Sequence, residues 1–187
     1  MKKMIVLLLM LLFVSGCCCT SSTYTSSINS RSSITKSSNC KEYKIDEDVL
    51  NNLGITYMQV VNEYGNYTNK IYFEGNYFYY FDKANRAYYF GTDGVELPLS
   101  NSLCIGIYIN AQYLFLNMDN EISIDDLCLK YSLTLLGEPE KSVEYDDTYY
   151  SFFNLGKYRI WIQSSSPKMI CRNSIVYIEK PVDTPQS

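Results

Sequence analysis

The chain of 187 residues carries 20 acidic and 16 basic residues, which gives a net charge of −4. No run of basic residues occurs, and this argues against nucleic acid as a partner. The sequence contains no histidine, which excludes Ser-His-Asp and Cys-His catalysis and histidine-ligated zinc, and it has no glycine-rich phosphate loop, CxxC pair or GxSxG motif. We therefore expect a protein that is not an enzyme and that holds no cofactor and no metal.

The first residues have the pattern of a secretory signal. Lys2 and Lys3 precede an apolar run over residues 4–14, which is too short to span a bilayer as a mature helix. The tetrapeptide Val14-Ser15-Gly16-Cys17 follows, and it resembles the lipobox of bacterial lipoproteins. This resemblance implies that residues 1–16 are removed as a signal peptide and that the mature chain begins with a lipidated Cys17.

The anchor sets the expected location. A diacyl chain with a modified amino terminus attaches a protein lastingly to a membrane, so we expect this protein at the cell membrane, facing outside the cytoplasm. Residues 20–39 are rich in Ser and Thr, so we expect residues 17–39 to form a flexible tether with a reach of roughly 25 Å. The alternative is an ordinary secretory signal beside a chance cysteine, and Cys18 and Cys19 blur the exact site. Without Lys2 and Lys3 the mature chain has 14 basic and 20 acidic residues, a net charge of about −6.

The folded part divides into two similar halves, 40–110 and 111–182, followed by a tail at 183–187. In the first half the pattern predicts helices over 46–53 and 56–64, with Thr56 as N-cap, and strands over 68–73, 77–82, 87–92 and 104–110. In the second half it predicts a short helix over 111–117, a helix from 124 to about 136 capped by Ser123, and strands over 142–145, 149–154, 158–164 and 174–180.

An internal repeat relates these halves. When Gly65 is placed on Gly137, Tyr89 falls on Trp161, because each lies 24 residues downstream of its glycine. The order helix, helix, glycine and four antiparallel strands, together with the segment 53–65, resembles the β-lactamase inhibitor protein fold over about residues 44–180. Small outer-membrane assembly lipoproteins with a single such repeat are similar too. The resemblance implies an α+β fold made of a tandem repeat of helix-helix plus a four-stranded antiparallel sheet, and an unrelated α+β domain is the alternative.

Alternation along the strands divides the side chains between two faces of the sheet. We expect Tyr158, Ile160 and Ile162 on a helix-covered core face, and the repeat register adds Phe78, Tyr80, Tyr88, Phe90, Tyr150 and Phe152 to that face. The opposite face is then the predicted binding face, and it carries Tyr77, Tyr79, Phe81, Tyr89, Tyr149, Phe153, Arg159 and Trp161. Tyrosine and tryptophan are enriched in binding hot spots. The alternative is that these tyrosines stabilise cross-strand pairs without binding anything.

The sequence does not determine how the remaining cysteines pair, and it offers two pairs of neighbouring carboxylates. Cys40, Cys104, Cys128 and Cys171 lie outside the lipobox cluster, and they allow three full disulfide pairings or remain as buried free thiols. The pairs Asp125-Asp126 and Asp146-Asp147 have the positions of helix-start and turn residues.

These observations favour an extracytoplasmic lipoprotein that acts as a non-catalytic binding module for a protein or an envelope polymer. The resemblance suggests inhibition of a hydrolase as a special case. An envelope assembly or scaffold lipoprotein is the second hypothesis, and a carbohydrate-directed enzyme that uses Asp and Glu is the third.

Overall fold

The computed structural model of the chain describes residues 41–73, 75–91 and 97–180. The chain divides into two units, Met1–Asn39 and Cys40–Ser187, and all described residues belong to the second unit. The predicted signal peptide, Cys17 and the predicted tether lie outside the described residues.

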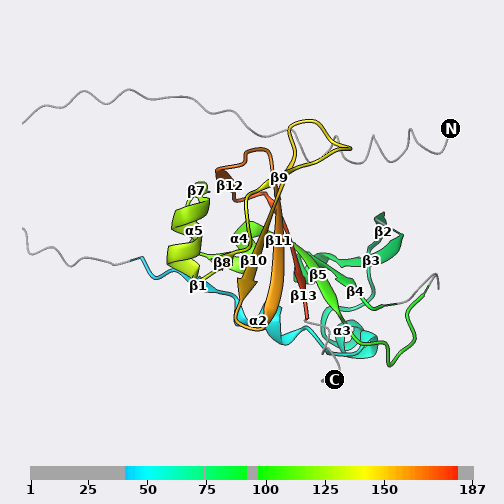
Figure 1. Ribbon diagram of the computed structural model, residues 1–187. Helices are drawn as coiled ribbons and strands as arrows, with labels where there is room; N and C mark the ends of the chain where they lie inside the picture. Colours follow the sequence, from blue (N-terminus) through cyan, green and yellow to red (C-terminus); the bar gives the residue numbers. More distant parts are fainter. Residues whose placement is uncertain (1–40, 74, 92–96, 181–187) are drawn as a thin grey trace, which may run out of the picture. The chain divides into compact units, whose positions relative to one another are not determined.

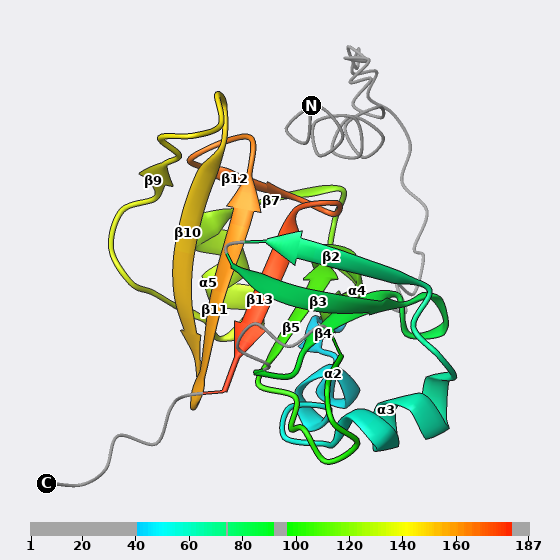
Figure 2. The same cartoon turned by 90° about the vertical axis from the view of Figure 1, so that its right-hand side faces the viewer.

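One antiparallel sheet of nine strands dominates the second unit (Figure 1). Its main path follows the order β2-β3-β4-β5-β13-β11-β10-β8, and β9 pairs with the end of β10. The strands are β2 (Asn69–Phe73), β3 (Asn76–Phe81), β4 (Arg86–Tyr89), β5 (Gly106–Asn110), β8 (Thr134–Leu135), β9 (Glu140–Lys141), β10 (Tyr149–Leu155), β11 (Tyr158–Ser164) and β13 (Ile175–Glu179). The sheet is strongly twisted, since β2 and β3 cross the view at a steep angle to β10 and β11 (Figure 2).

Short elements complete the unit. Two small sheets pair β1 (Lys44–Ile45) with β6 (Phe115–Leu116) and β7 (Glu121–Ser123) with β12 (Met169–Cys171). The helices are α2 (Glu47–Asn51), α3 (Tyr57–Tyr64), α4 (Ala111–Leu114) and α5 (Ile124–Tyr131), with a 3₁₀ turn η1 (Asp82–Ala84) between β3 and β4. Thr56 caps α3 in a capping box with Gln59, and Ser123 caps α5, as predicted from the sequence.

The predicted fold class is wrong. The described residues form thirteen strands and four short α-helices, so the unit is mostly β and is not a tandem repeat of helix-helix plus a four-stranded sheet. The two halves share one sheet, because β5 pairs with β13 along their full five-residue lengths.

The helices expected in the second half are also shorter than predicted. The helix expected over 111–117 ends at Leu114, because the next two residues pair with β1 as strand β6. The helix expected to reach residue 136 ends at Tyr131, where Ser132 takes a left-handed conformation with φ 56°, and β8 then pairs with β10. In both places, residues that the sequence pattern assigned to a helix form a strand instead, because they pair with the backbone of another segment.

The hydrophobic core lies between the helices and one face of the sheet. Cross-strand partners in an antiparallel sheet share a face, and one row of partners crosses six strands. That row consists of Tyr79, Tyr88, Ile107, Ile178, Ile160 and Phe153, each at most 1% exposed. Val49 and Leu50 of α2, Val60 of α3 and Leu127 of α5 belong to the same core, so we name this side the core face and the other side the open face.

Candidate binding surface

The face assignment made from alternation is correct for β4 and β11. Tyr88, Ile160 and Ile162 are buried in the core, as expected. Tyr89 and Trp161 alternate with them and therefore lie on the open face. Arg159 shares that face and is exposed.

The assignment is inverted for β3 and β10. Tyr79, Phe81 and Phe153 were expected on the binding face, but they are fully buried in the core. Tyr77 and Tyr149 lie an even number of residues from these side chains, so they share the same face, and both are half-buried. Tyr77 packs against the core. The physical reason is that both strands carry aromatic residues on both faces, so a period of two does not mark which face is buried.

A cluster of six aromatic rings occupies the open face instead. We call it the aromatic cluster, and it comprises Phe78, Tyr89, Tyr108, Tyr150, Trp161 and Tyr177. These residues come from β3, β4, β5, β10, β11 and β13, so the cluster crosses most of the sheet. Phe78 is buried, and the other five rings are half-buried.

The rings of the aromatic cluster hold one another in place. Tyr108 lies at its centre, with ring centroids 4.5 Å from Phe78, 4.8 Å from Tyr177 and 5.4 Å from Trp161. Trp161 also contacts Tyr150 edge-on at 5.6 Å and Tyr177 at 5.3 Å. Such edge-to-face and tilted pairs stabilise each other beyond the area that they bury.

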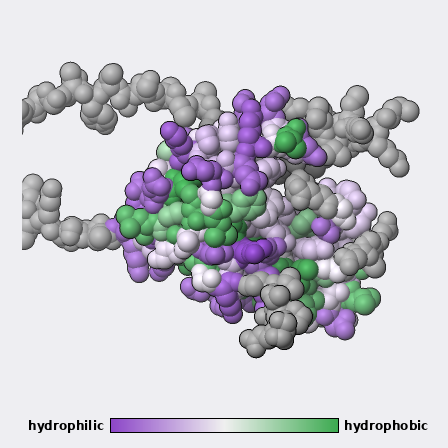
Figure 3. Space-filling model, in the orientation of Figure 1, coloured by the Kyte–Doolittle hydropathy of each residue, from purple (hydrophilic) through white to green (hydrophobic). Residues whose placement is uncertain are grey.

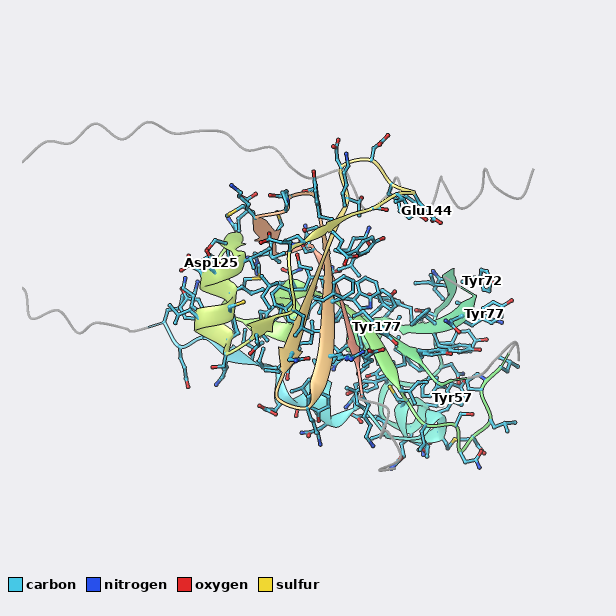
Figure 4. The ribbon with its side chains drawn as sticks, in the orientation of Figure 1. Tyr57, Tyr72, Tyr77, Asp125, Glu144 and Tyr177 are labelled. Carbon is cyan, nitrogen blue, oxygen red and sulfur yellow. The ribbon has the colours of Figure 1, made fainter. Side chains whose placement is uncertain are left out.

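Two small residues make room for these rings. The row across the open face reads Tyr80, Ala87, Tyr108, Tyr177, Trp161 and Phe152. Ala87 leaves space beside Tyr108, where Phe78 packs. Gly106 leaves space beneath Tyr177, because a Cβ atom at Gly106 would lie within 2.7 Å of the tyrosine ring. Figure 4 shows Tyr177 directed from β13 into the space on the β2–β3 side of the sheet.

The aromatic cluster is more compact than the spacing of its strands. β3 and β13 are separated by β4 and β5, a spacing of roughly 14 Å in a flat sheet. The ring centroids of Phe78 and Tyr177 are nevertheless only 6.2 Å apart. The rings therefore lean toward a common centre and form one surface.

Sequence reasoning missed Tyr108 and Tyr177. Both alternate with core residues, Tyr108 with Ile107 and Ile109, and Tyr177 with Val176 and Ile178. Alternation was therefore sufficient to place both tyrosines on the open face. It could not predict that β5 pairs with β13, and this pairing places the two tyrosines side by side next to Trp161.

The acidic pairs occupy the structural positions predicted for them. Asp125 and Asp126 lie in the first turn of α5, where the helix dipole favours negative charge, and Asp147 takes a turn conformation with φ 55°. In the described segments no group of three His, Cys, Asp or Glu residues could hold a metal ion.

The cysteines in the described part of the chain form no disulfide. Cys104 is buried and Cys128 and Cys171 are half-buried, and no disulfide joins any two of the three. Cys40 lies outside the described residues. The pairings among Cys104, Cys128 and Cys171 that the sequence left open are thus not formed in this structure.

Comparison of the chain with protein-family models, with curated proteins and with solved structures finds no match. Within residues 41–73, 75–91 and 97–180, no helix has the length and apolar character needed to cross a membrane.

Proposed function

We propose that this protein is a lipid-anchored extracytoplasmic binding module, which recognises a protein or an envelope polymer through the aromatic cluster and performs no catalysis. The observation that carries this proposal is the cluster itself, six mutually packed rings on the face of the sheet that the helices leave open. Inhibition of a hydrolase would be one special case of such recognition.

The chemistry of the cluster suits recognition. Tyrosine and tryptophan combine a large apolar ring with a polar tip, and they lose little conformational freedom on binding because they have two side-chain torsions. Here the rings are already packed against one another, so their side chains lose little conformational entropy when a ligand binds. Tyr89 is fixed further, since its hydroxyl donates a hydrogen bond to Oδ1 of Asn76 at 2.8 Å.

Neighbouring side chains supply a rim of mixed character. Arg159 is exposed and Gln163 half-buried on β11, and both share the face of Trp161. On the other side Ile71 of β2 pairs with Phe78 and is exposed. An aromatic centre with such a rim has the composition of a recognition surface.

Trp161 provides the test, with Ile160 as a matched control. Trp161→Leu alters the aromatic cluster, whereas Ile160→Val alters the core directly beneath it and costs about 0.5–1.5 kcal/mol of stability. The full-length wild type and both variants are solubilised in detergent, immobilised and exposed to an envelope fraction. Bound proteins and glycans are then quantified.

We expect the wild type and Ile160→Val to retain the same ligand. Loss of a central aromatic anchor costs about 2 kcal/mol or more of binding energy, so Trp161→Leu should bind it roughly thirtyfold more weakly. Equal retention by all three proteins, or no retention by the wild type above an empty support, would contradict the proposal.

A further inference from the structure

A second surface, at the end of the domain that contains α3, exposes large aliphatic side chains. We call it the leucine surface, and it comprises Met58, Leu97, Leu99, Leu103 and Ile105, which are between 41% and 68% exposed. Hydrophobic residues, drawn in green, are visible at the lower right of the space-filling view, where Figure 1 shows α3 (Figure 3). Single exposed leucines are ordinary, but here four of the five side chains come from residues 97–105, a loop that lies against the first turn of α3, which carries the fifth.

The loop that carries these leucines is held rigidly against α3. The backbone N–H groups of Tyr57 and Met58, in the first turn of the helix, donate to the carbonyls of Ser102 and Ser100 at 2.8 and 3.1 Å. Such first-turn donors have no partner inside their own helix, so the loop supplies one. The backbone of Ser102 also donates to the carbonyl of Leu99, which closes a turn. The leucines are therefore presented outward by a fixed backbone.

Charged residues are missing from the segments that build this surface. Residues 53–62 and 97–118 contain no Asp, Glu, Lys or Arg, although the mature chain has a net charge of about −6. The polar residues of the loop are Ser100, Asn101 and Ser102, which are all uncharged. Charged residues adjoin these segments, with Glu63 in the last turn of α3 and Glu96 directly before Leu97. The uncharged segments themselves can approach apolar material without the desolvation of ions.

The composition of the surface favours lipid over protein as its occupant. Hot spots in protein interfaces are enriched in Trp, Tyr and Arg and poor in Leu, and three of the five exposed side chains that define the leucine surface are leucines. The aromatic cluster has the opposite composition. Aliphatic side chains match the hydrocarbon of a bilayer, where apolar groups of a membrane-bound protein are buried at the level of the headgroups.

The predicted anchor brings a bilayer within reach. The described chain begins beside β1 and α5, on the side away from α3 (Figure 1). A domain of about 140 residues is roughly 40 Å across. The 24 residues from Cys17 to Cys40 can extend to about 80 Å, so the tether is long enough for the far end of the domain to touch the same membrane.

From these observations we propose that the leucine surface rests in the outer leaflet of the membrane and contacts lipid acyl chains. The protein then has a second membrane contact, which fixes the orientation of the domain. Contact at this end leaves the aromatic cluster, on the open face of the sheet, to its own ligand. This inference rests on the proposed lipid anchor, which supplies the nearby bilayer.

Photo-crosslinking in intact cells tests this inference. The photoreactive residue p-benzoylphenylalanine replaces Leu99 in the full-length chain, and in a second variant it replaces Leu103. The matched control carries it at Val143, which is a fully exposed apolar residue outside the leucine surface. Figure 4 places the neighbouring Glu144 at the top of the view and Tyr57, next to Met58, at the bottom. After irradiation, the adducts are identified by mass spectrometry as lipid, as a second copy of the chain or as another protein.

We expect lipid adducts at positions 99 and 103 at several times the yield found at position 143. Adducts with another protein or with a second copy, or equal lipid yields at all three positions, would overturn the inference. Incorporation of labelled palmitate at Cys17 is measured in the same cells. This measurement separates a failure of the proposed lipid anchor from a failure of the proposed contact between the leucine surface and the membrane. Palmitate without lipid adducts overturns only the leucine surface, and lipid adducts without palmitate overturn only the anchor.

Discussion

At the scale of single residues, the open face depends on a glycine whose role is steric. Gly106 pairs with Tyr89 on one side and with Glu179 on the other. The atoms nearest to a Cβ at this position belong to Tyr177, and the hydroxyl oxygen is the nearest of them. The glycine therefore admits the tyrosine ring into the aromatic cluster, and it has no positive φ that would require glycine for backbone reasons.

Replacement of this glycine should disrupt the cluster. Gly106→Ala forces the Tyr177 ring to move, and overpacking of this kind costs about 1–3 kcal/mol. Trp161 is the single tryptophan of the chain and contacts Tyr177, so its fluorescence should change together with the unfolding midpoint. Adding Tyr177→Val should recover part of the lost stability, because the smaller side chain accommodates the new methyl group. Strictly additive losses in the double variant would show that the two positions do not interact.

Burial of Cys104 gives a second prediction at this scale. The side chain is fully buried, and burial raises the pKa of its thiol from an ordinary value of 9.0 to about 12. Since the folded-state pKa is raised, the neutral thiol contributes stability below the unfolded pKa, and this contribution is lost as the pH rises toward 12. At pH 8.5 almost no thiolate forms at Cys104 in the folded protein.

Alkylation should therefore distinguish the cysteines. With iodoacetamide at pH 8.5, half-buried Cys128 should react faster than Cys104 in the folded protein, and peptide mass spectrometry measures both sites. Both should react at similar rates in denaturant, which is the control. Equal reactivity without denaturant would show that Cys104 is not buried.

At the scale of elements, α5 ends in a conformation that suits glycine better than serine. Ser132 follows the helix with φ 56° and ψ 41°, and its side chain is exposed. A residue with a Cβ atom pays a steric cost in this left-handed region, which glycine avoids.

Ser132→Gly should consequently raise the free energy of unfolding by about 0.5–1 kcal/mol, after allowance for the greater freedom of glycine in the unfolded chain. The melting temperature should rise by roughly 1–4 °C in a thermal scan. Ser132→Ala is the control and should bring no gain, since alanine retains the Cβ atom. A gain for alanine equal to that for glycine would mean that the side chain of serine, and not the backbone conformation, limits stability here.

The elements show which parts of the fold a sequence can predict. Local signals sufficed for α3, whose N-cap Thr56 and final Gly65 stand where the pattern placed them, and for β11, which has the predicted bounds. The two-residue strands β1, β6, β8 and β9 were missed, because each is too short to show an alternating pattern and is defined by its pairing. The partners β1 and β6 are also far apart in the chain. The same limit applied to the candidate site. Trp161 and Tyr89 were assigned to the open face by alternation, but their neighbours in the aromatic cluster follow from the β5–β13 pairing.

At the scale of the whole molecule, attachment to the membrane should depend on one residue of the signal region. Cys17→Ala removes the proposed acylation site, so the protein should no longer enter the detergent phase in phase partitioning, while the wild type should do so. Cys18→Ala is the matched control and should behave like the wild type. Full partitioning of Cys17→Ala into the detergent phase would refute the proposed anchor site.

The shared sheet also predicts how the domain unfolds. β5 of the first half pairs with β13 of the second, and Ile107 of β5 is a fully buried neighbour of Ile178 in the core. A break between the halves would expose this continuous core, so the domain should unfold in one cooperative transition. Trp161 lies in β11 and reports on the second half, whereas far-ultraviolet circular dichroism reports on the whole sheet.

Ile107→Ala tests this cooperativity. Loss of the buried side chain should lower stability by about 2–5 kcal/mol. Because one core joins both halves, the fluorescence of Trp161 and the circular dichroism signal should shift together to the same lower denaturant midpoint, although the mutation lies in the first half. Two independent repeats would respond differently, with the Trp161 transition left in place while part of the circular dichroism signal moved. Coincident midpoints in the wild type and the variant would establish that the nine-stranded sheet, and not the half, is the unit that folds.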